Sequence, residues 1–481
     1  MLFNSISFAF FLPIVFILYW FFTNGNLKVQ NILLLIASYF FYGFWDYRFL
    51  FVLLFSTLLD FCVGIKMGEA KNLTTKKYWF WLSIIVNLGI LCFFKYCNFF
   101  IDSFAQIISS IGFHPNIWSL KLILPVGISF YTFHGLSYII DVYKGEAKPT
   151  KDIIGYAVFV SFFPLLVAGP IERAGHLLPQ IQSKRYFNFN NAVNGLKQIL
   201  WGLFKKLVIA DNCAEYVNTI FNNQLSYSGS TLVIGALFFT FQIYCDFSGY
   251  SDIAIGTARL FGIDLLRNFA FPYFSRDIAE FWRRWHISLS SWFKDYLYIP
   301  LGGSNGSIFI KIRNVFIIFL VSGFWHGANW TFIVWGAINA FYFLPLLLLN
   351  KNRTHLTIVA SGKYFPSLKD AFNILFTFSL TVFAWIFFRS ESIQYAISFI
   401  SNICSSTLFQ LPEVSKKVIP LIGLILFFIC IEWLGREREF AISHIGLRWP
   451  VFLRWSFMSF IIFLIGMYMQ TTETPFIYFQ F

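Results

Sequence analysis

Charged residues are scarce in this sequence. Asp, Glu, Lys and Arg together make up 12% of the 481 residues, whereas hydrophobic residues make up 58%. Soluble domains carry roughly 25% charged residues, and a soluble fold of this length cannot bury so much apolar surface. The scarcity of charge therefore excludes an ordinary soluble protein and predicts a chain that lies largely within a membrane.

The sequence also lacks the cysteine patterns of disulfide frameworks and metal sites. No Cys-x-x-Cys pair occurs among the seven cysteines, which lie at positions 62, 92, 97, 213, 245, 404 and 430. No histidine has a partner at metal-ligand spacing. We therefore interpret the cysteines as small buried residues and predict no metal site.

Acidic residues are fewer than basic ones, which leaves a formal charge of +13. In a soluble protein this excess would suggest nucleic acid as the partner. In a membrane protein, lysine and arginine collect in cytoplasmic loops and beside anionic head groups. We therefore expect membrane lipids, and no nucleic acid, as partners.

Two further features are missing from the sequence. The first apolar segment, 8–22, has no basic region before it and no small-residue cleavage site after it, so we interpret it as a retained span. No internal repeat is visible. Because many transporters are built from inverted repeats, this absence disfavours a transporter.

Long apolar runs are what the sequence has in abundance. A membrane helix needs about 20 mostly apolar residues. Candidate spans are 5–22, 31–44, 48–65, 78–97, 121–140, 153–168, 230–250, 315–349 (long enough for a broken pair), 371–388, 418–434 and 450–469. The sequence predicts an all-α polytopic membrane protein with roughly 11–13 membrane helices in a single domain, 1–481.

The basic loops predict the orientation of the chain. Four lysines between positions 66 and 77 place the third loop in the cytoplasm, so the N-terminus is expected outside. Loops 141–152 and 435–449 are also basic and fall on the cytoplasmic side by the same count. The last span then exits, which places the tail, 470–481, outside. The segment 169–315 is not resolved by this argument.

His326 is the sharpest candidate for chemistry. No charged residue occurs between Arg313 and Lys351, and His326 lies near the middle of that stretch, between Gly323 and Gly327. An ionisable residue in an apolar span is a functional candidate, and burial would keep the imidazole in the neutral form that a general base needs. The alternative is a core histidine hydrogen-bonded between helices.

A second candidate lies in the segment 276–296, which as a helix would be amphipathic. Its apolar stripe would carry Phe281, Trp285, Leu289, Trp292 and Tyr296. His286 falls at the edge of that stripe. The segment equally suits an interfacial helix whose arginines, Arg283 and Arg284, hold lipid head groups, or a basic mouth for an anionic acyl donor.

Six blocks of sequence, in order along the chain, resemble the membrane-bound O-acyltransferase (MBOAT) superfamily. More narrowly they resemble its bacterial branch of alginate O-acetyltransferases (AlgI) and peptidoglycan O-acetyltransferases, and the resemblance runs from residue 1 to 481. The blocks are Leu124-Pro125-Val126-Gly127-Ile128-Ser129-Phe130-Tyr131, Val167-Ala168-Gly169-Pro170-Ile171-Glu172-Arg173, Tyr244-Cys245-Asp246-Phe247-Ser248-Gly249-Tyr250-Ser251-Asp252, Trp282-Arg283-Arg284-Trp285-His286-Ile287-Ser288-Leu289-Ser290, Asp295-Tyr296-Leu297-Tyr298-Ile299-Pro300-Leu301-Gly302-Gly303 and Gly323-Phe324-Trp325-His326-Gly327.

The resemblance implies a helical bundle around a funnel that opens to the cytoplasm of a bacterial inner membrane. It implies catalysis by His326, near the middle of the bilayer, and a supporting role for His286. Acetyl-CoA would be the donor, and we expect Trp282, Arg283 and Arg284 to line its entrance. The acetyl group would leave on the outer side to a periplasmic SGNH-type transferase.

The tail, Thr474-Pro475-Phe476-Ile477-Tyr478-Phe479-Gln480-Phe481, adds a third candidate. It resembles the C-terminal motif of the small peptide in teichoic acid D-alanylation and the tails of AlgI relatives. A tyrosine hydroxyl is a competent covalent acyl carrier once a base activates it, so Tyr478 is a candidate relay. The alternative is an aromatic anchor at the membrane surface.

The leading hypothesis is therefore O-acetyl transfer from acetyl-CoA to a cell-envelope or secreted polysaccharide. D-alanyl transfer to teichoic acid remains an alternative, as does a non-enzymatic polysaccharide transporter. Acetyl esters or D-alanyl esters on the envelope would distinguish the first two. The motifs do not distinguish one acceptor polysaccharide from another.

Overall fold

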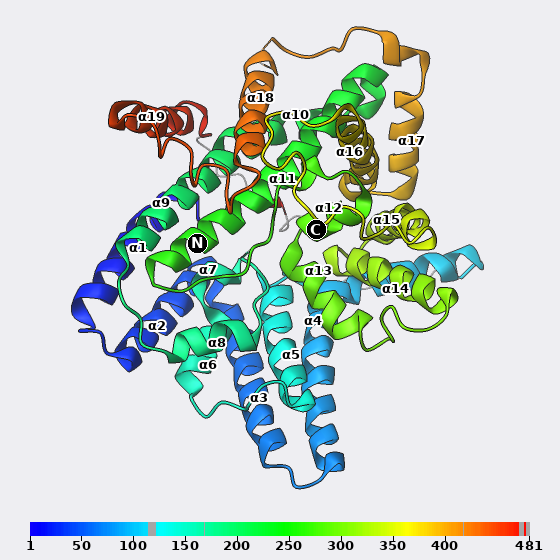
Figure 1. The fold of residues 1–481 in the computed structure, drawn as a ribbon. Coiled ribbons are helices and arrows are strands. Elements are labelled where there is room, and N and C mark those ends of the chain that lie inside the picture. Colours follow the sequence, from blue (N-terminus) through cyan, green and yellow to red (C-terminus); the bar gives the residue numbers. More distant parts are fainter. Residues whose placement is uncertain (114–121, 168, 417, 471–475, 478–481) are drawn as a thin grey trace. The chain divides into compact units, whose positions relative to one another are not determined.

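The computed structural model describes residues 1–113, 122–167, 169–416, 418–470 and 476–477. Within these ranges the chain is helical and contains no strand. Eight segments of the described chain are long and apolar enough to cross a membrane, and one of them, 27–69, contains two helices. The prediction of an all-α polytopic membrane protein is confirmed (Figure 1).

The contacts divide the chain into two compact units. The first comprises residues 1–192 and 258–266, and the second comprises 193–257 and 267–481. Helices of the first unit are α1 (Ile6–Ile17), α2 (Leu27–Asp46), α3 (Leu50–Glu69), α4 (Leu73–Ser110), α5 (Ile128–Lys144), α6 (Ile153–Ser161), α7 (Phe163–Leu166) and α8 (Ala174–Gln182). The predicted span 153–168 is thus two helices, because the chain bends at Phe162.

In the first unit, α3, α4 and α5 pack against one another (Figure 1). The carboxylate of Asp60 on α3 accepts hydrogen bonds from Ser83 (2.6 Å) and Asn87 (2.8 Å) on α4. A Cβ at Gly135 of α5 would lie 2.1 Å from the same carboxylate, so glycine allows α5 to approach. Hydrogen bonds and small residues are the usual means of packing helices in lipid.

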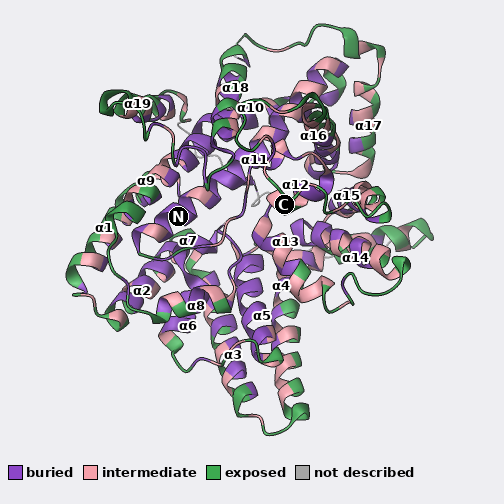
Figure 2. Ribbon diagram, viewed as in Figure 1, coloured by how far each residue is buried: buried purple, intermediate pink, exposed green. Residues whose placement is uncertain are grey.

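The second unit contains the predicted site residues Trp282, Arg283, Arg284, His286 and His326. Its helices are α9 (Phe189–Leu203), α10 (Asp211–Asn222), α11 (Gly229–Leu260), α12 (Ile278–Arg284), α13 (Ile287–Phe293), α14 (Ile308–His326), α15 (Trp330–Leu348), α16 (Leu368–Arg389), α17 (Ile393–Ile403), α18 (Val418–Gly435) and α19 (Val451–Tyr468). Residues 189–192 of α9 and 258–260 of α11 belong to the first unit. α11 is buried along most of its length, whereas α19 is largely exposed (Figure 2). This contrast separates a core helix from one that faces its surroundings.

The predicted broken pair in 315–349 is confirmed as the hairpin of α14 and α15. Two glycines allow the helices to touch: a Cβ at Gly323 would lie 2.2 Å from the carbonyl oxygen of Phe332, and one at Gly336 would lie 2.3 Å from that of Phe319. Asn329 then caps α15 by accepting from the N–H of Thr331 (3.0 Å). The hairpin therefore fixes the end of α14, where His326 lies.

Candidate active site

His286 lies at a sharp break between α12 and α13. Its backbone has φ 42° and ψ 55°, the left-handed region that few residues other than glycine occupy, although histidine enters it more often than most. The amphipathic pattern favoured one continuous helix over 276–296. That prediction is wrong, because the helical hydrogen bonding ends at Trp285 and begins again at Ile287.

The segment 268–270 supplies the hydrogen bonds that replace the helical ones. The N–H of Ala270 donates to the carbonyl of Arg284 (3.0 Å), and the N–H of Ile287 donates to the carbonyl of Asn268 (2.8 Å). The side chain of Asn268 also accepts from the hydroxyl of Ser288 (2.5 Å). These bonds satisfy backbone groups on both sides of His286, so the turn is stabilised by tertiary contacts.

The His286 side chain is buried among rings, at 1% exposure. Its nearest ring is Phe247 on α11, edge to face at 4.6 Å between centroids. Burial lowers its pKa to about 3, so the imidazole is neutral at physiological pH. Neither ring nitrogen has a hydrogen-bond partner among the described residues, whereas buried polar atoms nearly always have one. A neutral imidazole with one donor and one acceptor is therefore available to a ligand.

His326 is the last residue of α14 and is 4% exposed. Its ring packs edge to face against Trp335 of α15 (5.2 Å) and Phe388 of α16 (5.4 Å). The centroids of the His326 and His286 rings lie 6.4 Å apart. The two histidines, which are 40 positions apart in the sequence, thus share one aromatic-lined site in the second unit.

Trp282, a predicted donor-site residue, lies on α12 against the α14–α15 hairpin. Its indole N–H donates to the side chain of Asn339 (3.3 Å), and its ring contacts Phe319 and Trp335. Trp335 also contacts His326. Trp282 is therefore separated from the candidate catalytic ring by one tryptophan.

The two predicted donor-site arginines have different surroundings. Arg283 is exposed, and its guanidinium donates to the carbonyl groups of Asn352 and His355, both at 2.8 Å. Arg284 is half-buried and forms an ion pair with the buried carboxylate of Glu280 at 2.8 Å. Arg283 is thus the more accessible cation.

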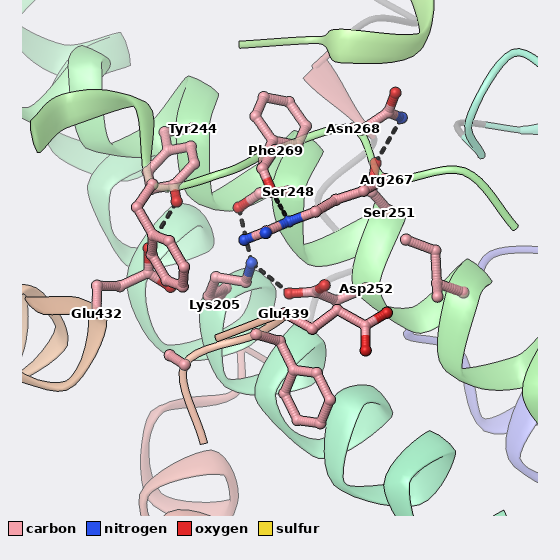
Figure 3. Close-up of a pocket in the computed structure, with 14 residues that line it drawn as sticks. Lys205, Tyr244, Ser248, Ser251, Asp252, Arg267, Asn268, Phe269, Glu432 and Glu439 are labelled. Atoms are coloured by element: carbon pink, nitrogen blue, oxygen red, sulfur yellow. Dashed lines mark hydrogen bonds and ion pairs between the residues drawn. The ribbon is translucent and has the colours of Figure 1, made fainter. Parts of the chain in front are cut away.

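A small cavity of about 20 Å³ lies within the second unit, and its residues were not among the site residues that the sequence predicted (Figure 3). Lys205 there forms an ion pair with Asp252 (2.5 Å) and donates to Ser248 (2.9 Å), and Tyr244 donates to Glu432 (2.6 Å). Asn268 donates to Ser251 (3.0 Å), and Figure 3 shows it beside that cavity. The available signal was the block 244–252, in which five polar residues contact partners at least 17 positions away: Tyr244, Asp246, Ser248, Ser251 and Asp252.

Tyr478 lies outside the described residues. Phe476 and Ile477, which precede it, are described and buried, at 0% and 2% exposure. The N–H of Ile477 donates to Asp246 on α11 (2.7 Å). The residues before Tyr478 are thus attached to the helix that also carries Phe247.

Comparison with known proteins assigns a family to this arrangement. The profile of the MBOAT, membrane-bound O-acyltransferase, family matches residues 146–390. That range contains both histidines.

Individual relatives extend the similarity over most of the chain. The chain is 40% identical over 418 residues to the probable alginate O-acetylase AlgI of Pseudomonas aeruginosa, covering 86% of this chain and 77% of the relative. It is 36% identical over 473 residues to the peptidoglycan O-acetyltransferase of Helicobacter pylori, covering 92% and 85%. A teichoic acid D-alanyltransferase of Streptococcus thermophilus is 29% identical over 322 residues, covering 60% and 75%.

Proposed function

Because this chain belongs to the membrane-bound O-acyltransferase family, we propose that it moves acetyl groups from cytoplasmic acetyl-CoA to a polysaccharide of the cell envelope. Alginate-type and peptidoglycan-type acetylation are both compatible with the relatives. D-alanyl transfer is disfavoured, since that relative matches at 29% over 60% of the chain.

The observation that carries the proposal is the pair of buried histidine rings, 6.4 Å apart, one from the break between α12 and α13 and one from the end of α14. His326 accepts the proton of the attacking hydroxyl while that oxygen bonds to the thioester carbon. The C–S bond then breaks, and His326 returns the proton to the thiolate of coenzyme A. His286, neutral and with both ring nitrogens available, orients the acyl group.

The donor enters from the cytoplasmic side past α12, and the funnel leads to the two histidines. Arg283 is exposed and suits the phosphates of coenzyme A. Because both histidine side chains are at most 4% exposed, aromatic rings beside them move when the thioester arrives. Arg283→Glu should raise the KM for acetyl-CoA more than it lowers kcat, and an unchanged KM would remove Arg283 from the donor site.

The acetyl group leaves on the outer face through Tyr478. Its hydroxyl attacks the thioester, and the resulting tyrosyl ester passes the acetyl group to a periplasmic SGNH-type transferase. The placement of both termini outside rests on the basic loops. Tyr478→Phe removes one oxygen atom, so this variant should lose glycan acetylation, and mass spectrometry of the wild type should find an acetylated C-terminal peptide.

The substrate itself is tested by the esters on the envelope. Cells that depend on this chain should carry acetate that mild alkali releases from a polysaccharide, and cells expressing His326→Ala should not. Release of D-alanine in place of acetate would show that the chain transfers D-alanyl groups and not acetyl groups. Equal acetate from both strains would refute it.

A further inference from the structure

The carboxylate of Asp246 is buried inside the second unit, at 2% exposure. Lys206 forms an ion pair with it at 2.8 Å and a second one with Asp211 at 2.9 Å. One buried cation thus serves two carboxylates, although burial itself opposes the charged lysine. A charge removed from water needs further hydrogen-bond donors. The main-chain N–H of Ile477, at 2.7 Å from Asp246, supplies one.

Phe476 adds an apolar contact next to this hydrogen bond. Its ring lies 4.5 Å from that of Tyr250 and 5.9 Å from that of Phe247, one turn apart on α11. Phe247 in turn contacts His286 at 4.6 Å, edge to face. Two ring contacts therefore connect the tail to the candidate active site.

The residues that precede the tail are hydrogen-bonded close to the same ion pairs. Asn212 donates to the carbonyl of Tyr468 at the end of α19 (3.0 Å). Gln470 donates to the carbonyl of Asp211, the residue that shares Lys206 with Asp246 (3.2 Å). The described residues on both sides of 471–475 are thus hydrogen-bonded to one polar cluster, Lys206 with Asp211 and Asp246. This is evidence that the tail binds at a specific place.

We propose that Asp246, Phe247 and Tyr250 form a docking site for the C-terminal tail, which binds the main chain of Ile477 and the ring of Phe476. The carboxylate recognises an N–H that every residue except proline carries, while the aromatic pocket selects a large ring before it. Tyr478 follows directly in the sequence, and the docked Phe476 contacts Phe247, the residue that packs against His286. The functional value of docking rests on the proposed function; the docking itself does not.

Hydrogen–deuterium exchange of the full-length protein in lipid nanodiscs tests the docking without any activity. The amide of Ile477 should exchange at least about tenfold slower than in the free C-terminal peptide, since the bond is charge-assisted and buried. Phe476→Ala should abolish that protection, and Asp246→Asn should weaken it. Met467→Leu, on the exposed side of α19, is the matched control and should change nothing.

Measuring glycan acetylation in the same variants then distinguishes the docking of the tail from the role of Tyr478 as an acyl relay. Phe476→Ala should lose acetylation together with protection, while exchange in α11 and α13 stays as in the wild type. Tyr478→Phe should keep the protection and lose acetylation; if it stays active, the relay fails and the docking site stands. Wild-type exchange at Ile477 as fast as in the free peptide would overturn the docking site, as would full protection in Phe476→Ala.

Discussion

His286 lies on irregular backbone between two helices of seven residues each, whereas His326 ends a regular helix of 19 residues. Hydrogen bonds with Asn268 and Ala270 fix the backbone on both sides of the first. Close backbone packing through Gly323 and an aromatic shell hold the second. The site thus combines one histidine on backbone that hydrogen bonds hold with one on a helix that close packing holds, and the two should respond differently to the same kinds of substitution.

The largest expected effect is on chemistry at His326. His326→Ala should reduce acyl transfer by about 10²–10⁴-fold, the usual contribution of a general acid–base, because no other group replaces its proton transfer. Yield, membrane insertion and melting temperature should stay close to wild type. The exposed His444 provides the control, since His444→Ala should keep full activity. Near-normal transfer by His326→Ala would contradict the assignment.

The packing that fixes His326 is tested at Gly323. Gly323→Ala puts a Cβ 2.2 Å from the carbonyl of Phe332, so α14 and α15 must separate, at a cost of about 1–3 kcal/mol. Melting temperature and activity should both fall. At Gly423 on α18 an added Cβ would meet nothing within 4 Å, so Gly423→Ala should be neutral or slightly stabilising. Equal melting temperatures of the two variants would show that the close approach is unimportant.

The burial of His286 predicts a pH dependence of stability. Its pKa falls from an ordinary value of 6.5 to about 3 in the folded protein, so the folded state binds fewer protons than the unfolded one. This contribution is fully present above pH 6.5 and is lost below it, by up to about 1.4 kcal/mol per pH unit. His286→Asn should remove that slope between pH 6.5 and 5.5, measured by thermal unfolding; parallel curves for the two proteins would contradict it.

The smallest expected effect is the most direct test of the contrast in backbone. The free energy of unfolding of His286→Gly should exceed that of His286→Ala by about 1 kcal/mol, because φ is positive at this position. The free energy of unfolding of His326→Ala should exceed that of His326→Gly by about 0.5–1 kcal/mol, because this residue is helical. Denaturant unfolding of the four variants should show opposite signs, and the same sign at both positions would refute the contrast.

The regular membrane helices could be predicted from the sequence. Apolar runs predicted α14 and α15 as a broken pair, and the charge-free stretch around His326 singled out that residue. The break at His286 could not be predicted, since the period of 276–296 continues through it. The turn depends on hydrogen bonds that Asn268 accepts and Ala270 donates, and these tertiary contacts cannot be read from periodicity.

The buried charges show the same limit. Lys205 and Lys206 look like surface residues in the sequence, yet they form ion pairs with Asp252 and Asp246 inside the second unit. The block 244–252 resembles the family in sequence, but the sequence does not reveal what its polar residues contact. Whether each side chain is paired depends on neighbours that are distant along the chain, and these become visible only in the fold.

The central claim is that His286 and His326 act as one site, and a double-mutant cycle tests it most directly. His286→Gly, His326→Ala and the double variant are compared by kcat/KM for acyl transfer from labelled acetyl-CoA, after equal folding is established. Residues that act as a unit are strongly non-additive, so the double variant should lie within about threefold of His326→Ala alone. If the two losses multiply instead, the histidines act independently and the account of a shared site is wrong.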